Sequence, residues 1–255
     1  MAFELVEIGE HRLYRGDCLE VLPTLDAGIV DAVVTDPPYE GMAGGTEIRG
    51  SGGVAPPNVA SKTIGNELGS AEGLLESSRV ARLGAIAFCS YHWIERCAVL
   101  LGGKRRCIVS WYKRNSPFST NNSPWFVTEY AWAVQYRPGI DWRTLRTHID
   151  EPLLPAGCMA QERIVAGGTA VHPAQKPIAV MAAVLLPGMT SVLDMYMGLG
   201  TTGVACARTG RKFIGIEREQ KYFDIACKRI EDELTRHPLF EATTPTQASL
   251  FTEAD

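Results

Sequence analysis

The segment Asp36-Pro37-Pro38-Tyr39 has residue types and a spacing that directly indicate chemistry. Two consecutive prolines stop helix formation and fix an extended, rigid turn, which holds Asp36 and Tyr39 in place. The Asp36 carboxylate and the Pro37 carbonyl form an acceptor pair that can bind both N–H groups of an exocyclic amine and make its lone pair available. The flat ring of Tyr39 can stack on a base, which is worth about 1–3 kcal/mol. A plain proline turn before a loop is the alternative interpretation of the tetrapeptide.

A second segment has the pattern of a cofactor loop. Gly198, Gly200 and Gly203 follow the short apolar run Ser191–Asp194 with the spacing G-x-G-x-x-G, and Glu217 ends the next apolar run. This arrangement is typical of sites for adenosine-containing cofactors, in which the later acid accepts hydrogen bonds from the ribose. Nicotinamide dinucleotides and S-adenosylmethionine both contain adenosine. Asp194 precedes the glycines and suits the cationic amino-acid end of S-adenosylmethionine, although an ordinary βα turn with an Asp cap is also compatible.

Short apolar runs that alternate with helical patterns must position these two segments. Near-continuous apolar runs indicate strands covered on both faces, so we predict a doubly wound, mostly parallel α/β sheet that binds ligands at its carboxyl edge. The predicted strands lie around Leu13-Tyr14, Ile29–Thr35, Ala85–Cys89, Cys107–Tyr112, Tyr130–Gln135, Ser191–Asp194 and Phe213–Glu217. The predicted helices are Leu19–Leu25, Tyr91–Leu101, Ala174–Leu186, Thr201–Thr209 and Gln220–Arg236.

Three stretches interrupt this alternation. Gly41–Gly69 is rich in glycine, so we predict a mobile loop over residues 40–80 that could act as a lid after Tyr39. Residues 115–170 combine prolines, aromatics and arginines and are predicted to form an insert for target recognition. Residues 238–255 are polar and are predicted to be a disordered tail. Residues 1–237 would then form a single domain, a size compatible with one full core.

Composition favours a cytoplasmic protein. No apolar run approaches the roughly 20 residues that span a bilayer, and the first residues do not look like a signal peptide. The seven cysteines are scattered and form no C-x-x-C pair, so we expect reduced thiols and no metal site. The net charge is −4, yet residues 104–146 carry eight basic and two acidic side chains, a local excess that could meet phosphates.

Four motifs in a fixed order resemble the DNA adenine-N6 and cytosine-N4 methyltransferases of the permuted β group. In that group the catalytic tetrapeptide precedes the glycine loop, as it does here, and the resemblance covers roughly residues 11–236. Gly16-Asp17-Cys18 resembles the segment that contacts the cofactor adenine, and His172-Pro173-Ala174-Gln175-Lys176-Pro177 resembles the motif beside the methionine end. Asp194–Thr202 resembles the cofactor loop, and Ile214–Glu217 the ribose-binding strand. Met195 and Tyr196 depart from the usual proline and phenylalanine.

The resemblance implies a seven-stranded, Rossmann-like sheet with S-adenosylmethionine as the methyl donor and flipped-out adenine N6 in double-stranded DNA as the acceptor. Cytosine N4 is the alternative target, disfavoured because cytosine enzymes often carry Ser at the position of Asp36. The implied cofactor residues are Asp17, Cys18, Asp36, His172, Lys176, Asp194, Tyr196, Met197, Gly198, Gly200, Thr201, Thr202 and Glu217. The implied DNA-binding residues are Lys113, Arg114, Arg143 and Arg146. Relatives are often dimers, so a homodimer is expected.

Other functions remain open at this stage. A nicotinamide-dependent oxidoreductase would explain the glycine loop but not the tetrapeptide. RNA or protein-glutamine methyltransferases use a related motif, usually with Asn first and with the glycine loop earlier in the chain. A catalytically inactive DNA-binding module is disfavoured by intact Asp36 and Glu217. The small size and the lack of a nuclease motif favour an orphan or phage-type modifier. In the tail, Gln247-Ala248-Ser249-Leu250-Phe251 resembles the peptide that docks replication proteins onto the sliding clamp.

Overall fold

The computed structural model describes residues 3–38, 68–89, 93–113, 128–151, 164–166, 169–170 and 175–236. Within these ranges, side chains are not described for residues 68–71, 165–166 and 169–170. In the part that is described, no helix is both long enough and apolar enough to cross a membrane.

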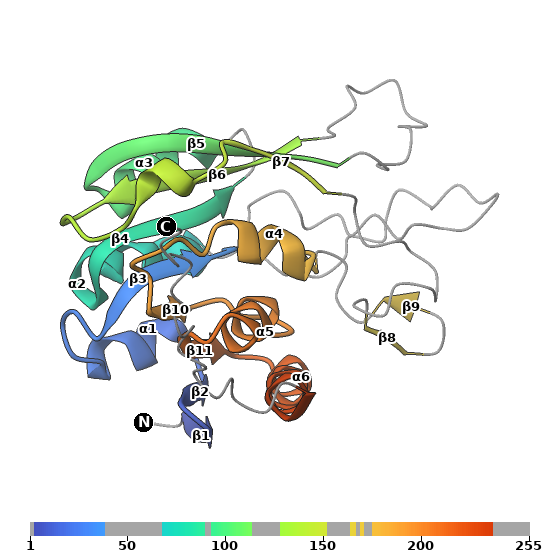
Figure 1. Ribbon diagram of the computed structural model, residues 1–255. Helices are drawn as coiled ribbons and strands as arrows, with labels where there is room; N and C mark the ends of the chain where they lie inside the picture. Colours follow the sequence, from blue (N-terminus) through green and yellow to red (C-terminus); the bar gives the residue numbers. More distant parts are fainter. Residues whose placement is uncertain are drawn as a thin grey trace, which may run out of the picture.

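One nine-stranded sheet organises the chain, with the strand order β1-β2-β11-β10-β3-β4-β6-β5-β7 (Figure 1). From β2 to β4 all neighbours are parallel, whereas β1 and β6 run antiparallel to their neighbours. The strands are β1 (Glu4–Ile8), β2 (His11–Arg15), β3 (Val30–Thr35), β4 (Ala81–Cys89), β5 (Lys104–Tyr112), β6 (Thr128–Gln135), β7 (His148–Asp150), β10 (Ser191–Asp194) and β11 (Lys212–Glu217). A separate two-stranded sheet pairs β8 (Val165–Ala166) with β9 (Thr169–Ala170).

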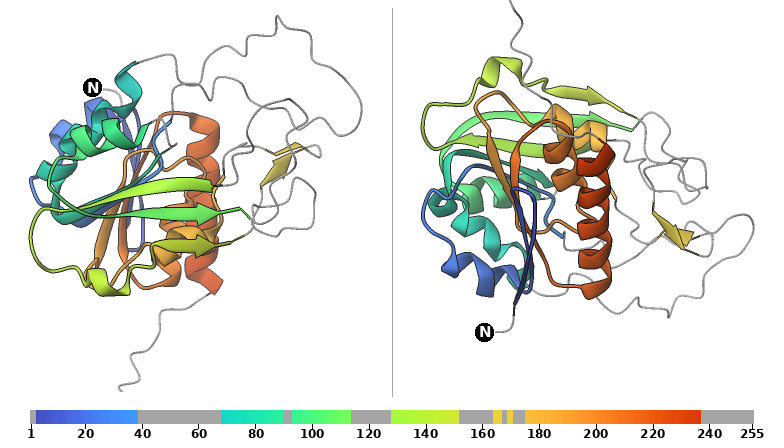
Figure 2. Two further views of the ribbon diagram at one scale, coloured as in Figure 1. Left: turned by 90° about the horizontal axis from the view of Figure 1, so that it is seen from above. Right: turned by 60° about the horizontal axis from the view of Figure 1, so that its bottom comes forward.

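Helices cover both faces of the large sheet, as Figure 2 shows from two sides. One face carries α1 (Cys18–Val21), η1 (Leu22–Thr24), η2 (Leu68–Glu76), α2 (Ser77–Val80) and α3 (Ile94–Leu101). The other carries α4 (Ile178–Ala183), α5 (Thr201–Arg208) and α6 (Gln220–Arg236). A short helix, η4 (Trp142–Thr144), precedes β7.

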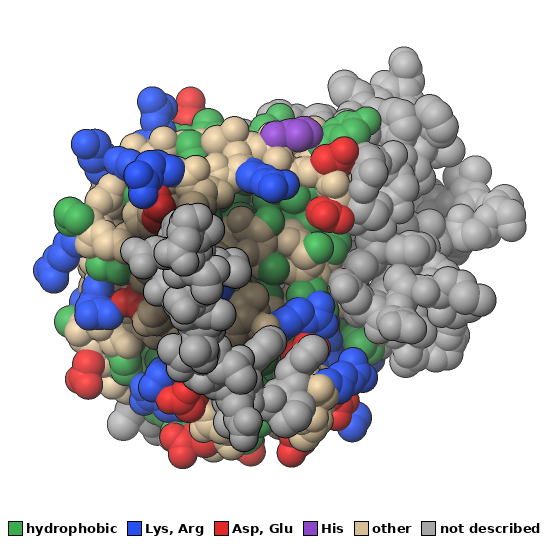
Figure 3. Space-filling view, viewed as in Figure 1, with side chains coloured by type: hydrophobic (Ala, Val, Ile, Leu, Met, Phe, Trp, Pro, Cys, Tyr) green, Lys and Arg blue, Asp and Glu red, His purple; other side chains and the backbone are tan. Residues whose placement is uncertain are grey.

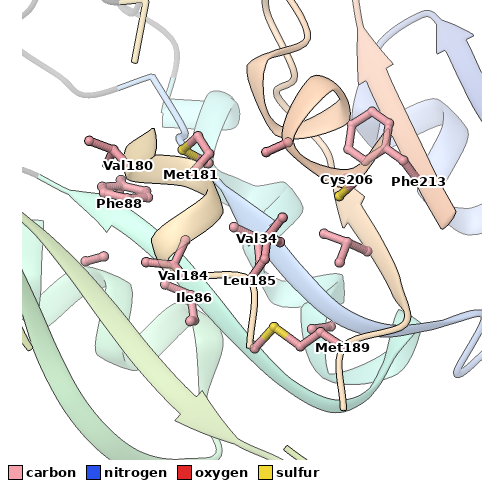
Figure 4. Packing of buried hydrophobic residues seen from close by; sticks show 14 of the residues in the cluster. Val34, Ile86, Phe88, Val180, Met181, Val184, Leu185, Met189, Cys206 and Phe213 are labelled. Carbon is pink, nitrogen blue, oxygen red and sulfur yellow. The ribbon is translucent and has the colours of Figure 1, made fainter. Parts of the chain in front are cut away.

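The alternation of side chains along the central strands creates two cores. In β4, Ile86 and Phe88 pack against Val180 and Met181 of α4, where Figure 4 shows them together. Ala85 and its neighbours on the opposite side of β4 belong to the second core. Because successive side chains of a strand point to opposite faces, the uninterrupted apolar runs of the sequence require a helix layer on each side. The predicted doubly wound α/β class is therefore confirmed.

All seven predicted strands are present, and β1 and β7 extend the sheet to nine. The two additional strands are short and mostly exposed, so they lack the apolar run that marked the others. The predicted helix Gln220–Arg236 matches α6 at both ends, whereas α4 is shorter than the predicted Ala174–Leu186.

Two predicted boundaries were wrong. The mobile loop predicted for residues 40–80 does not include residues 68–80, which form η2 and α2. The side chains of Leu74 and Val80 in these helices are fully buried in the core. The glycine-rich composition extends only to Gly69, whereas apolar residues beyond it supply enough burial for a helix. The stretch 115–170 is likewise not a separate insert throughout, because β6 and β7 are strands of the main sheet.

The glycine loop owes part of its composition to packing, which predicts the effect of Gly203→Ala. Within a helix this change alone would stabilise the protein by about 1 kcal/mol. The added methyl would, however, lie 2.4 Å from Ile230 Cδ1 and 2.7 Å from Phe213 Cε1. Overpacking typically costs about 1–3 kcal/mol, so we expect a lower melting temperature. Ala207→Ser, at a half-buried position of the same helix, is the control and should change stability by about 0.5 kcal/mol or less. A raised melting temperature for Gly203→Ala would contradict this packing argument.

Candidate active site

The carboxyl ends of β2, β11, β10 and β3 lie next to one another in the sheet and bring together segments that are far apart in sequence. The next described elements after β3 are η2 and α2, which lie on one face of the sheet. The element after β10 is α5, which lies on the other face. β3 and β10 are adjacent and parallel, so the crevice of a doubly wound sheet lies between their ends. Asp36 follows β3 directly, and the glycine loop follows β10. The tetrapeptide and the cofactor loop therefore meet at this point.

A hydrogen bond locks the ends of these two strands together. Thr35 Oγ1 donates to Asp194 Oδ1 at 2.6 Å across 159 residues of sequence, and the Tyr196 backbone N–H donates to the same oxygen at 3.1 Å. Thr202 Oγ1 donates to Asp194 Oδ2 at 2.6 Å. The Asp194 side chain is thus buried and fixes the start and the end of the glycine loop. The role expected of it, facing the amino-acid end of a cofactor, stays a prediction.

The glycine loop is shaped by close backbone approach and by Glu217. Gly200 precedes α5 with φ of 74°, and a Cβ there would lie 2.8 Å from the Cβ of Ala226 in α6, so only glycine fits. The Glu217 carboxylate at the end of β11 accepts hydrogen bonds from the backbone N–H of Gly198, at 3.0 Å, and of Glu219, at 2.7 Å. Burial raises the pKa of Glu217. Each carboxylate oxygen can accept a further bond, so the group suits a diol such as ribose.

Beside Glu217 lies the segment that resembled an adenine-contacting motif. The Gly16 backbone N–H donates to the Glu217 carbonyl at 3.0 Å, and the Asp17 side chain caps α1 by accepting from the Leu19 N–H at 2.9 Å. Cys18 is buried next to Tyr196, and a Cβ on Gly73 of η2 would come within 2.7 Å of the Tyr196 hydroxyl. That hydroxyl is buried and lies beside the Cys18 thiol and the Gly73 backbone. The end of the stretch 40–80, at Gly73 of η2, therefore packs onto the cofactor loop at Tyr196.

On the other side of the crevice, Asp36 is part of a charged cluster. Its Oδ2 accepts from the ammonium of Lys176, and Lys176 Nζ lies 3.0 Å from Glu129 Oε2. Lys113 forms an ion pair with the same Glu129. The sequence analysis did not single out Glu129. The available signal was that Glu129 and Asp141 are the only acids among the basic residues of 104–146, and that Glu129 stands at the start of an apolar strand.

The structure separates the residues expected to bind DNA. Lys113 is largely buried and forms an ion pair with Glu129, an arrangement that does not favour contact with DNA phosphates, so its assignment to DNA stays an untested prediction. Arg143 is highly exposed and forms an ion pair with Asp141. The backbone N–H of Asp141 donates to the carbonyl of Pro187, which lies shortly before β10 begins at Ser191. Arg143 therefore lies at the end of the sheet remote from Asp36. Figure 3 shows Lys and Arg side chains gathered at the upper left of this face, with Asp and Glu among them. Arg146 is exposed.

Several predicted positions lie outside the described residues. These are Tyr39, Arg114, His172 and the tail peptide Gln247–Phe251. Of the remaining catalytic and cofactor positions, Asp17, Cys18, Asp36, Pro37, Pro38, Lys176, Asp194, Tyr196, Met197, Gly198, Gly200, Thr201, Thr202 and Glu217 all lie at or beside the carboxyl edge of the sheet.

Residues 111–228 match the family model of the N6/N4 DNA methylases, described as DNA methylase. The type II methyltransferase M.HinfI of Haemophilus influenzae is 27% identical over 246 residues, which cover 86% of this chain and 68% of that protein. The type II methyltransferase M2.DpnII of Streptococcus pneumoniae is 45% identical over 65 residues, 24% of each chain. Over these segments the chain is similar to N6/N4 DNA methylases.

Solved structures of such methylases share the fold. The complex of M1.HpyAVI with S-adenosylmethionine aligns with a TM-score of 0.59 and 26% identity, covering 86% of this chain and 98% of that one. The PvuII DNA methyltransferase, a cytosine-N4-specific enzyme, aligns with a TM-score of 0.61 and 14% identity over 91% and 94% of the two chains, a likeness of fold alone. The Rossmann-like methyltransferase fold implied by the motif order is thus confirmed.

The ionisation of Asp194 makes the free energy of unfolding of the protein depend on pH. Burial raises its pKa to about 6, against the hydrogen bonds from Thr202, Thr35 and the Tyr196 N–H, which lower it. The ordinary value is 3.8. The folded state therefore holds a proton that the unfolded state releases, so this contribution is present below about pH 4 and is lost as the pH rises through about 6.

Asp194→Asn should remove that contribution. In urea unfolding across pH 4–7, the stability of the wild type relative to the variant should fall as the pH rises. A relative stability that stays constant over this range would contradict the assigned burial of a titrating carboxylate.

Proposed function

We propose that this protein transfers a methyl group from S-adenosylmethionine to the exocyclic N6 amine of adenine in double-stranded DNA. The observation that carries the proposal is the position of Asp36, at the crevice between the cofactor loop after β10 and the charged cluster around Lys176. One edge of the sheet thereby offers an adenosine-binding half and an amine-binding half next to each other.

The residues at the edge fit S-adenosylmethionine. Glu217 suits the ribose hydroxyls, and the left-handed turn at Gly200, which packs against Ala226, fixes the course of the glycine loop beside it. The buried Tyr196 hydroxyl and the adjacent Cys18 border the same half of the crevice. The Glu217 carboxylate, whose oxygens can each accept a further hydrogen bond, suits a ribose diol better than a pyrophosphate. When bound, S-adenosylmethionine supplies an electrophilic methyl group.

Asp36 and Pro37 would bind and orient the target amine. A base amine is a poor nucleophile because its lone pair is delocalised into the ring. If the Asp36 carboxylate and the Pro37 carbonyl each accept one N–H, the nitrogen becomes more tetrahedral and its lone pair points away from the ring. Alignment of the nitrogen with the donor carbon then supplies much of the rate enhancement. A duplex base must be flipped out of the stack to reach this position, where Tyr39 would stack on it.

Adenine is proposed over cytosine because the motif begins with Asp at position 36. The relatives include a cytosine-N4-specific enzyme at the level of fold, so cytosine N4 is the second candidate. DNA as the substrate supports a cytoplasmic protein. Arg146 and Arg114 are proposed to contact DNA, and Arg143 would reach it only through a surface remote from Asp36. A homodimer is proposed from the resemblance alone.

Mapping of modified bases tests the central proposal. DNA from cells that express the wild type should contain N6-methyladenine at a recurring sequence, and N4-methylcytosine instead would move the target to cytosine. Asp36→Ala, together with the closer isostere Asp36→Asn, should lower methyl transfer by roughly 10²–10⁴-fold, the usual contribution of a positioned side chain of this kind. Both variants should keep most of the affinity for S-adenosylmethionine, measured by calorimetry. Methylation that survives in both would rule out the mechanism, and DNA without either mark would rule out the function.

A second partner is proposed for the tail. Gln247–Phe251 would bind a sliding clamp, with Leu250 and Phe251 filling an apolar pocket and Gln247 adding polar specificity. Deletion of residues 246–255 should abolish binding to purified clamp in surface plasmon resonance while methylation of short oligonucleotides continues. Equal clamp affinity of the full-length and shortened proteins would remove this idea.

A further inference from the structure

Four charged side chains from four different parts of the chain form one continuous cluster beside the crevice. In order of contact they are Asp36 after β3, Lys176 before α4, Glu129 at the start of β6 and Lys113 after β5. Negative and positive side chains alternate along the cluster, which therefore contains two charges of each sign. Asp36 belongs to the proposed catalytic motif and Lys176 to the implied cofactor residues, which leaves the purpose of Glu129 and Lys113 to be explained.

Burial shows that these are not ordinary surface salt bridges. The exposed fractions of the side chains are 22% for Asp36, 6% for Lys176, 15% for Glu129 and 13% for Lys113. Taking charges out of water costs several kcal/mol per ion, and replacing buried pairs by apolar residues is often neutral or stabilising. The cluster is therefore a poor device for stability alone. Its contact with Asp36 points to a role in the reaction.

Aromatic rings hold the central ammonium from the remaining sides. Lys176 Nζ lies 5.1 Å from the centroid of the Phe88 ring and 6.0 Å from that of Trp111. The Trp111 ring is itself fixed, since its Nε1 donates to the Glu151 carbonyl at 2.7 Å. With two carboxylates and two rings around it, Lys176 has little freedom to change its orientation.

We propose that Glu129 is a positioning residue for methyl transfer: it holds the Lys176 ammonium against the Asp36 carboxylate, and this contact fixes the orientation in which Asp36 accepts the target amine. The inference rests on the proposed function. Glu129 touches neither the target base nor the methyl donor in this assignment and acts through Lys176. Lys113 supplies the counter-charge on the far side of Glu129.

The electrostatics keep this arrangement charged over the working pH range. Burial alone would raise the pKa of Glu129, but the ammonium groups of Lys176 and Lys113 outweigh it and lower the pKa to about 2. Burial likewise opposes the charge of Lys176, but Asp36 and Glu129 together raise its pKa. Among the described residues, the Cys89 thiol of β4 also faces Lys176, and its pKa is raised. Neither Glu129 nor Lys176 should therefore titrate between pH 5 and pH 10.

Glu129→Gln is the direct test, because it keeps the shape and removes the charge. We expect kcat for DNA methylation to fall by about 10–100-fold, while the KM for S-adenosylmethionine and the melting temperature change little. Glu233→Gln is the matched control, since Glu233 is also a buried carboxylate, paired with Arg208 at 2.8 Å on the α5–α6 side of the sheet. It should leave kcat unchanged. Equal kcat in Glu129→Gln and wild type would overturn the proposal.

The pH profile separates positioning from a purely structural role. Without Glu129, Lys176 loses one of the two carboxylates that raise its pKa, while the burial that lowers it remains. The kcat profile of Glu129→Gln should therefore gain a loss of activity on the alkaline side that the wild type lacks. A profile parallel to that of the wild type at a uniformly lower level would show that Glu129 only supports the fold, and would overturn the proposal.

The variant Glu129→Gln/Lys113→Met removes one charge of each sign and carries the test if the single variant does not fold. It restores the balance of charge but not the second anchor of Lys176, so kcat should stay low. Recovery of wild-type kcat would show that Glu129 acts only through overall charge balance, against positioning. All measurements use the full chain, and the wild type is assayed alongside. An inactive wild type would refute the proposed function itself, whereas an active wild type with an equally active Glu129→Gln would refute this inference alone.

Discussion

The parallel pairing of β3 with β10 is the constraint on which the site depends. The two strands are distant in sequence, yet their pairing brings Asp36 and the glycine loop to one point of the sheet edge. A carboxylate pins each end of this pair. At the start, Asp31 accepts from the backbone N–H groups of Thr190 and Ser191 at 2.9 and 3.0 Å, and at the end Asp194 accepts from Thr35. Register is thereby fixed at both ends, and a slip of one residue would leave a buried acid without its donors.

The edge of the sheet is ordered by chemistry as well as by topology. The groups that suit adenosine, Glu217 and the segment around Asp17, lie on β11 and β2 on one side of the switch point. The charged cluster of Asp36, Lys176, Glu129 and Lys113 lies on the other side, toward β4, β6 and β5. A ligand that spans the crevice would meet hydrogen-bond acceptors at one end and a fixed carboxylate at the other. Under the proposed function, this division would place the methyl donor and the target amine next to each other.

Charge is used differently in the two regions. Near the cofactor loop the acids are isolated from cations, so burial raises the pKa values of Asp194 and Glu217. Near Asp36 every acid has a lysine, so the pKa of Glu129 is lowered instead. A nearby cationic ligand would offset the burial of the acids in the first environment, whereas the second environment is already balanced by its lysines. Balance favours a fixed geometry, because an uncompensated buried charge would draw in water or move.

The sequence by itself determined the fold class, all seven central strands and most positions of the site, because buried parallel strands and glycine turns leave strong local patterns. Asp36, Asp194 and Glu217 could be found since each ends an apolar run. The tertiary structure alone decided that Lys113 points inward to Glu129 and that Arg143 lies at the remote end of the sheet. A basic residue has the same local pattern whether it meets DNA or a buried acid, and only the long-range pairing of strands places that acid beside it.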